Sequence, residues 1–150
     1  MNLTEIDARA RFTASRHAYL ATVDGAGQPH LVPVTFAVDG GTVLIAIDHK
    51  PKRSTDLKRL RNIEANERVS LLVDEYDDDW SKLWWVRADG TARVLTEPAD
   101  RSGPLRLLAA KYPIYADRVP SGPVISIDIR AWTGWAYGSG NSPGAGSTIA

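Results

Sequence analysis

Apolar and polar residues alternate over much of the chain, as they do in β-strands with one buried face. Several of these runs end at Asp-Gly pairs, the usual signal of a tight turn between antiparallel strands. The first three runs therefore predict an antiparallel meander. Pro33 marks an edge or a bulge in it, because proline cannot donate a sheet hydrogen bond. The predicted strands cover residues 17–23, 30–38, 42–47, 68–76, 83–95 and 123–132.

Three other segments follow the period of a helix. Thr4 and Asp7 resemble a capping pair that opens the first one, and residues 97–112 form the last one. The middle helix is predicted over residues 54–65. The side chains expected on the inner faces are Ile6, Ala10 and Ala14 in the first helix and Leu57, Leu60 and Ile63 in the middle one.

This order of elements predicts a mainly β protein with peripheral helices. Six or so strands, with one helix after the third and another before the last, favour a small antiparallel barrel, closed or split. A length of 150 residues suits one domain, which we place at residues 1–137. Residues 138–150 are rich in glycine and serine and are expected to be a flexible tail.

The composition of the chain indicates in which compartment the protein works and which kinds of partner are not expected. The chain has no cysteine, which fits a reducing compartment. It has no signal peptide and no stretch near the roughly 20 apolar residues of a membrane span, so we expect a cytoplasmic protein without a membrane partner. Its 18 basic and 18 acidic residues balance. A general attraction for nucleic acid is therefore not expected.

The charges are nevertheless unevenly spread, and residues 49–61 are strongly basic. They lead into the predicted middle helix, for which Ser54 or Thr55 is a plausible N-cap. The first N–H groups of a helix lack partners, and its dipole places partial positive charge there. Cations before such a helix make a receptor for phosphate or carboxylate. The alternative is a solvated helix face with lysines in a loop.

Three stretches, in this order, resemble the pyridoxamine 5′-phosphate oxidase-like split-barrel superfamily. They are ATVDGAGQPHLVPVTF, KPKRSTDLKRLRNIEANERVSLLVD and DDDWSKLWWVRADGTARV. The resemblance spans residues 4–137 and is to the actinobacterial branch that uses the deazaflavin coenzyme F-420. It implies a split barrel (FMN-binding split barrel-like), a homodimer with two cofactor clefts between its subunits, and oxidoreductase activity on a small molecule.

The resemblance also implies where the cofactor binds. In such proteins the cofactor phosphate lies against the basic turn and the following helix, and the ring lies across neighbouring strands. The implied phosphate-binding residues are Lys50, Lys52, Arg53, Ser54, Thr55, Lys58 and Arg59. Those implied beside the ring are Pro33, Val34 and Thr35, with Trp84 and Trp85 as candidates for a pocket wall. The basic turn is longer here than in the flavin-type pattern.

The number of cations favours coenzyme F-420 over FMN. F-420 carries a phosphodiester and a glutamate tail, whereas FMN has one terminal phosphate. Either cofactor performs hydride transfer itself, so no catalytic side chain is predicted. The expected reaction is hydride transfer to a small unsaturated substrate. The alternatives are an FMN-dependent oxidase or reductase, a non-catalytic cofactor carrier, and a single-strand nucleic-acid binder, the last disfavoured by the zero net charge.

Tryptophan is concentrated around an acidic segment, residues 74–79. Trp84 and Trp85 are adjacent in a predicted strand and should face opposite sides, so at most one faces a cleft. The other interpretation of both is a place in the core or a dimer interface. The acidic segment lacks the glycine and terminal glutamate of a calcium-binding loop, so no metal site is predicted.

Overall fold

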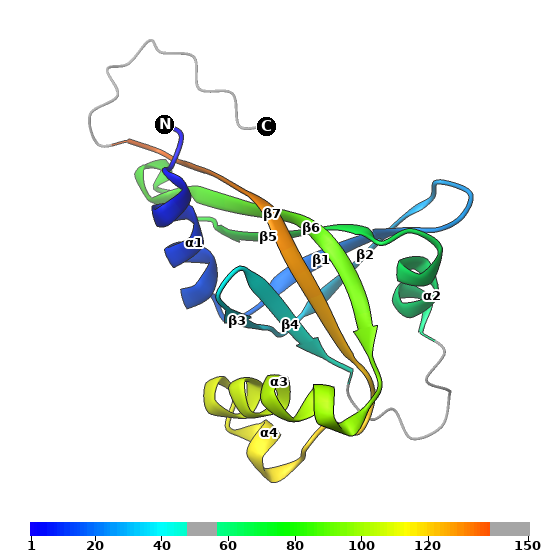
Figure 1. Cartoon of the computed structure of the whole chain (residues 1–150). Coiled ribbons are helices and arrows are strands. Elements are labelled where there is room, and N and C mark those ends of the chain that lie inside the picture. Colours follow the sequence, from blue (N-terminus) through cyan, green and yellow to red (C-terminus); the bar gives the residue numbers. More distant parts are fainter. Residues whose placement is uncertain (48–56, 139–150) are drawn as a thin grey trace.

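A computed structural model of the chain describes residues 1–47 and 57–138. These residues form one antiparallel seven-stranded sheet with helices packed around it (Figure 1). The strands are β1 (Ala18–Val23), β2 (Pro29–Val34), β3 (Ala37–Asp39), β4 (Thr42–Ala46), β5 (Arg68–Glu75), β6 (Trp84–Leu95) and β7 (Val124–Ala136). The helices are α1 (Glu5–Ala14), α2 (Lys58–Ala65), the 3-10 helix η1 (Trp80–Lys82), α3 (Pro98–Lys111) and α4 (Ile114–Asp117).

The strand order is β2-β1-β5-β6-β7-β4-β3, so β2 and β3 are the two ends of the sheet. Only Thr35 and Phe36 separate these two strands along the chain. The sheet must therefore curl until its ends meet at this corner, which makes it a split barrel. The predicted fold class, antiparallel and mainly β with peripheral helices, is confirmed.

The predicted meander of three strands is wrong in one respect. Residues 30–38 do not form a single strand but divide into β2 and β3, which pair with β1 and β4 respectively. The division falls at Phe36, which is fully buried and carries the chain across the barrel corner. Pro33 does lie in an edge strand, as expected, because β2 has a partner on one side only.

The barrel interior holds the main hydrophobic core. Alternate residues of β1 and β5 point into it, which explains the period of two in their sequences. The largest fully buried side chains include Phe12, Phe36, Leu20, Ile45, Leu71, Val86, Ile125 and Ile127. A smaller cluster, formed by Ala37, Ala46, Leu108 and Tyr112, joins α3 to the outer side of β3 and β4.

Helix α1 begins as the sequence predicts. The side chain of Thr4 is its N-cap and accepts a hydrogen bond from the backbone N–H of Asp7. Its inner face, however, is formed by Ala8 and Phe12. The predicted face of Ile6, Ala10 and Ala14 is wrong, and Ile6 is 80% exposed. Phe12 determines the orientation because its ring fits between Phe36 and Trp132.

Helix α2 begins later than predicted. Leu57 is its N-cap and makes no side-chain capping hydrogen bond, so the prediction of Ser54 or Thr55 as N-cap is wrong. The predicted inner face is confirmed: Leu60 and Ile63 are buried in the core and Leu57 packs against it.

Strand β6 matches its predicted range to within one residue, whereas β7 continues to Ala136, four residues beyond its predicted end. The two strands are paired along their whole length except at one bulge. The Asp-Gly pair within β6 is not a turn; the register shifts between Asp89 and Gly90. A Cβ atom on Gly90 would lie 2.4 Å from the carbonyl oxygen of Asp128, so only glycine fits there. The expected in-and-out alternation of β7 fails at its start. Ser126 is only 4% exposed there, and it lines a cavity together with Pro104 of α3.

Candidate functional site

The predicted phosphate site is described only in part. Lys50, Lys52, Arg53, Ser54 and Thr55 lie outside the described residues. Lys58 and Arg59 are the first two residues of α2, and their assignment as cofactor-binding residues stays a prediction. Figure 1 places α2 beside the β1–β2 hairpin, at one end of the barrel.

Lys58 bridges α2 to that hairpin. Its Nζ lies 3.4 Å from Oδ2 of Asp24, the residue that follows β1. The other carboxylate oxygen of Asp24 accepts hydrogen bonds from the backbone N–H groups of Ala26 and Gln28. The bonds from Gln28 and Ala26, and then the contact with Lys58, hold the pKa of Asp24 below its usual value. The carboxylate thus stays charged and keeps the Lys58 ammonium at this end of the barrel.

Arg59, unlike Lys58, has a buried donor atom. Its Nε is buried and has no hydrogen-bond partner among the described residues. Burial lowers the pKa of the guanidinium because the charged form loses hydration. A buried charged donor without an acceptor is costly. Arg59 is thus a cation with an unused donor in the first turn of α2, next to Lys58, and such a pair of cations is of the chemical kind that a cofactor phosphate requires.

The three residues predicted beside the ring lie at the opposite end of β1 and β2. Val34 pairs with Ala18 at one end of this hairpin and Pro29 with Val23 at the other. Five residue steps separate the two ends, which is roughly 17 Å. Pro33 is exposed, Val34 is 7% exposed and faces the core, and the Thr35 hydroxyl lies 2.7 Å from that of Tyr115. Only an elongated cofactor can reach both groups of predicted residues.

A groove on the outer face of the sheet runs over β1, β5 and β6. It consists of two cavities of about 430 and 460 Å³ that share Ala21 and Ser70 as lining residues. Each is within the size range of small-molecule sites. We call this feature the outer groove. Tyr19, Leu31 and Leu72 make one half of it apolar.

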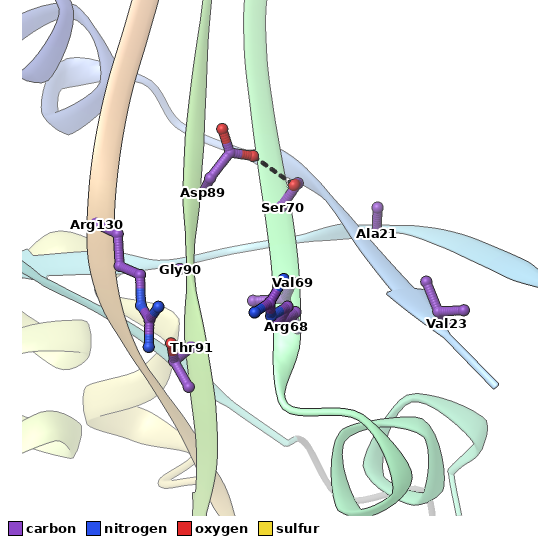
Figure 2. Close-up of a pocket in the computed structure, with 9 residues that line it drawn as sticks. All are labelled: Ala21, Val23, Arg68, Val69, Ser70, Asp89, Gly90, Thr91 and Arg130. Atoms are coloured by element: carbon purple, nitrogen blue, oxygen red, sulfur yellow. Dashed lines mark hydrogen bonds between the residues drawn. The ribbon is translucent and has the colours of Figure 1, made fainter. Parts of the chain in front are cut away.

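The other half of the outer groove contains charged side chains and is drawn in Figure 2. The hydroxyl of Ser70 donates to the Asp89 carboxylate over 2.5 Å. Arg68 and Arg130 lie at the other side of this cavity, near Thr91. The Thr91 hydroxyl is buried and has no partner among the described residues. This half therefore offers two guanidinium groups to a ligand, beside a buried hydroxyl that has no partner among the described residues.

Trp84 and Trp85 face opposite sides of β6, as the sequence predicts. Trp84 packs against the core, and the guanidinium of Arg11 lies 5.3 Å from the centre of its ring system. Trp85 faces the outer groove, where the guanidinium of Arg87 lies 6.0 Å from its ring centre. Of the two predicted wall residues, Trp85 is the one that lines the outer groove.

Most residues of the outer groove were not predicted from the sequence. Neither Lys58 nor Arg59, nor Pro33, Val34 or Thr35, lines it. One signal was present: β5 places Arg68, Ser70, Leu72 and Asp74 on the face opposite the buried Val69, Leu71 and Val73. An exposed strand face that includes Leu72 beside Tyr19 indicates a covered surface.

Two kinds of site are absent from the part of the chain that the structure describes. Within residues 1–47 and 57–138, no group of three His, Asp or Glu side chains is arranged to hold a metal ion. In the same part of the chain, no helix has the length and apolar character needed to cross a membrane.

A curled antiparallel sheet whose ends meet at one corner defines the split-barrel class of proteins. Comparison with known families gives the particular one: the model of the pyridoxamine 5′-phosphate oxidase family matches residues 5–136. The chain therefore belongs to this family.

Individual relatives agree with the assignment. The chain is 36% identical to a 5a,11a-dehydrotetracycline/5a,11a-dehydrooxytetracycline reductase of Streptomyces rimosus over 83 residues, which are 55% of this chain and 57% of that protein. An FAD-binding protein of Mesorhizobium loti has a similar structure, with a TM-score of 0.70 at 21% identity over 89% of this chain and 95% of that one. The FAD-binding protein of Mycobacterium smegmatis is also similar, with a TM-score of 0.61 at 19% identity over 91% of this chain and 98% of that one.

Proposed function

We propose that this protein is an oxidoreductase that binds coenzyme F-420 and reduces a small unsaturated molecule. The observation that carries the proposal is the buried, unpartnered Nε of Arg59 at the amino end of α2. It lies in a chain of the pyridoxamine 5′-phosphate oxidase family. A buried cationic donor without an acceptor is what a site for an anionic cofactor requires.

The cofactor would be held at two places. Lys58 and Arg59, with the basic residues that precede them, would bind its anionic tail. The ring would lie toward the far end of the β1–β2 hairpin, beside Pro33 and Thr35. The number of cations from Lys50 to Arg59 matches the phosphodiester and glutamates of F-420 better than the single phosphate of FMN.

The chemistry follows from the cofactor. When bound, the reduced deazaflavin supplies a hydride, and the substrate takes it up with a proton, so that a double bond becomes a single bond and the cofactor is oxidised. The reductase from Streptomyces rimosus is named for a substrate with such a bond. The protein's own residues would bind and orient both molecules and exclude water from the outer groove.

We also propose that the chain forms a homodimer through the outer face of the sheet. Tyr19, Leu31 and Leu72 are 37%, 66% and 38% exposed on this face. Such an apolar surface is typical of a face that another protein covers. A second subunit lying there would close the outer groove into a cleft between subunits.

The test is a titration of the apo protein with F-420 and with FMN, followed by cofactor fluorescence. The proposal expects saturable, micromolar binding of F-420 and weaker binding of FMN. Reduced F-420 should then be oxidised in the presence of a conjugated enone. Absence of F-420 binding would overturn the proposal.

The second candidate function is that of an FMN-dependent oxidoreductase. It is favoured by one observation: the structures similar to this one include two proteins named as FAD-binding. Tighter binding of FMN than of F-420 in the same titration would establish it instead.

A further inference from the structure

A third cavity continues the outer groove at the end far from α2. It has a volume of about 150 Å³ and shares Asp74 and Trp85 with the apolar half of the groove. Its walls are aromatic: Tyr76, Trp80, Trp84, Trp85 and Trp135. We call it the aromatic pocket. Four of the chain's five tryptophans line it. Such a concentration of aromatic side chains at one surface cavity is typical of a ligand site.

Strand register builds the floor of the aromatic pocket. Trp85 of β6 is directly opposite Trp135 of β7 and, on its other side, opposite Asp74 of β5. The three side chains therefore form a row across three strands, on one face of the sheet. Trp80 comes from η1 in the β5–β6 connection and is 55% exposed. A large exposed indole beside an aromatic floor leaves a ring face available to a ligand.

The pocket is also acidic. Asp74 and Glu75 line it, and among the described residues neither has a hydrogen-bond or ion-pair partner. The neighbouring acidic residues Asp77 and Asp79, in contrast, accept hydrogen bonds within their own loop. Asp77 accepts from the backbone N–H of Asp79, and Asp79 accepts from the N–H and hydroxyl of Ser81. Asp74 lies on the same face as Trp85, and Glu75, the next residue of β5, is opposite Trp84; both carboxylates are exposed at the rim of the pocket without a partner among the described residues.

Two arginines lie near, and neither neutralises these carboxylates. Arg87 forms an ion pair with Asp89, with Nε and Oδ2 3.0 Å apart. Arg11 lies over Trp84 of β6 and forms no ion pair among the described residues. Both guanidiniums lie over indole rings, at 6.0 and 5.3 Å. The chain therefore already places cations on tryptophan faces at this end of the barrel.

We propose that the aromatic pocket binds an organic ammonium group, carried by the substrate. Aromatic walls and adjacent carboxylates are the combination that recognises alkylated ammonium, through the negative ring faces and the opposite charge. The volume corresponds to roughly five water molecules, which suits a nitrogen with its carbon substituents. The substrate class is then an apolar, unsaturated molecule with an amine that is cationic at neutral pH.

The test compares choline with 3,3-dimethyl-1-butanol, its neutral analogue of the same shape, by isothermal titration calorimetry at fixed ionic strength. The proposal expects saturable choline binding at least about tenfold tighter than that of the neutral analogue. Equal binding of the two compounds, or no choline binding, would overturn it.

Variants locate the site. Trp80→Leu should weaken choline binding about tenfold, and Trp80→Phe should weaken it less because an aromatic face remains. Asp74→Asn with Glu75→Gln should reduce choline to the level of the neutral analogue. Asp117→Asn, an exposed acid on α4, is the matched control and should change nothing. Circular dichroism shows whether each variant is folded. Unchanged choline affinity in folded Trp80→Leu protein would overturn the assignment.

The role of the pocket as the substrate end of the groove rests on the proposed function, but the choline titration needs no cofactor. The two ideas therefore fail separately. A protein that binds F-420 but not choline keeps the proposed function and loses this site. A protein that binds choline but no cofactor keeps this site and loses the proposed function.

Discussion

At the scale of single residues, burial changes the chemistry of several cations, and Lys111 shows it most clearly. This residue ends α3, with its Nζ 3.8 Å from the centre of the Phe36 ring and 3.4 Å from the carbonyl oxygen of Thr13. Burial, together with the charge of Arg16, lowers the pKa of Lys111 to about 8. The amine therefore loses its proton near physiological pH instead of far above it.

This pKa predicts a pH dependence of stability. The folded-state pKa of about 8 lies below the ordinary value of 10.5. Between these values the unfolded chain binds more protons than the folded one, so the stability of the fold rises with pH. We expect the melting temperature of the wild type to rise, relative to that of Lys111→Met, from pH 7.5 to 9.5. The matched comparison is Arg106→Met on the exposed side of α3, which should show no trend. A constant difference for Lys111→Met would contradict the assignment.

At the scale of elements, α2 is the part that must be held still if it is to bind a cofactor. Its buried Asn62 donates a hydrogen bond to the hydroxyl of Thr22 in β1, over 3.0 Å. The two residues are 3% and 1% exposed. This bond and the packing of Leu60 and Ile63 fix the helix to the barrel, so that Lys58 and Arg59 have a defined position.

The Asn62–Thr22 bond can be tested by a pair of variants. Asn62→Ala leaves the Thr22 hydroxyl buried without its donor and should lower the free energy of unfolding by about 1–3 kcal/mol. Replacing both groups, as Asn62→Leu with Thr22→Val, should recover much of this loss because no buried polar group remains unpaired. Urea unfolding measures both. A double variant no more stable than Asn62→Ala would show that the bond is not what holds α2.

Individual elements were largely predictable, because their signals are local. The cap at Thr4, the inner face of α2 and the edge position of Pro33 follow from neighbouring residues. The division of residues 30–38 into two strands at Phe36 was not predictable. The sequence stays largely apolar through this stretch, and the strand ends there only because the barrel closes at this corner. The need for glycine at position 90 was not predictable for a similar reason: it comes from the carbonyl of Asp128, in a strand far along the chain.

The candidate site was predictable only where charge is concentrated. The basic segment directed attention to Lys58 and Arg59. Apart from Trp84 and Trp85, which were candidate wall residues, the outer groove and the aromatic pocket were not predicted, because they depend on strand order. Residues as distant as Asp74, Trp85 and Trp135 become neighbours only when β5, β6 and β7 pair.

At the scale of the whole molecule, the outer face of the sheet is the surface expected to form the dimer. We predict that Leu31→Lys with Leu72→Lys yields a monomer, because four charges would be buried in a symmetric interface. Analytical ultracentrifugation measures the mass. The control is Ile114→Lys on α4, which is 62% exposed and lies away from this face. A monomeric wild type, or equal dissociation of the control, would contradict the proposed interface.

The central claim is that the cations at the amino end of α2 hold the anionic tail of the cofactor. Its most direct test is the affinity of F-420 for the wild type and for the double variant Lys58→Ala with Arg59→Ala. Each charge-assisted contact contributes about 1.5–3 kcal/mol. We therefore predict a loss of affinity of at least about 100-fold in the folded double variant, with circular dichroism used to show that it is folded. Equal affinity of the folded double variant and the wild type would contradict the account.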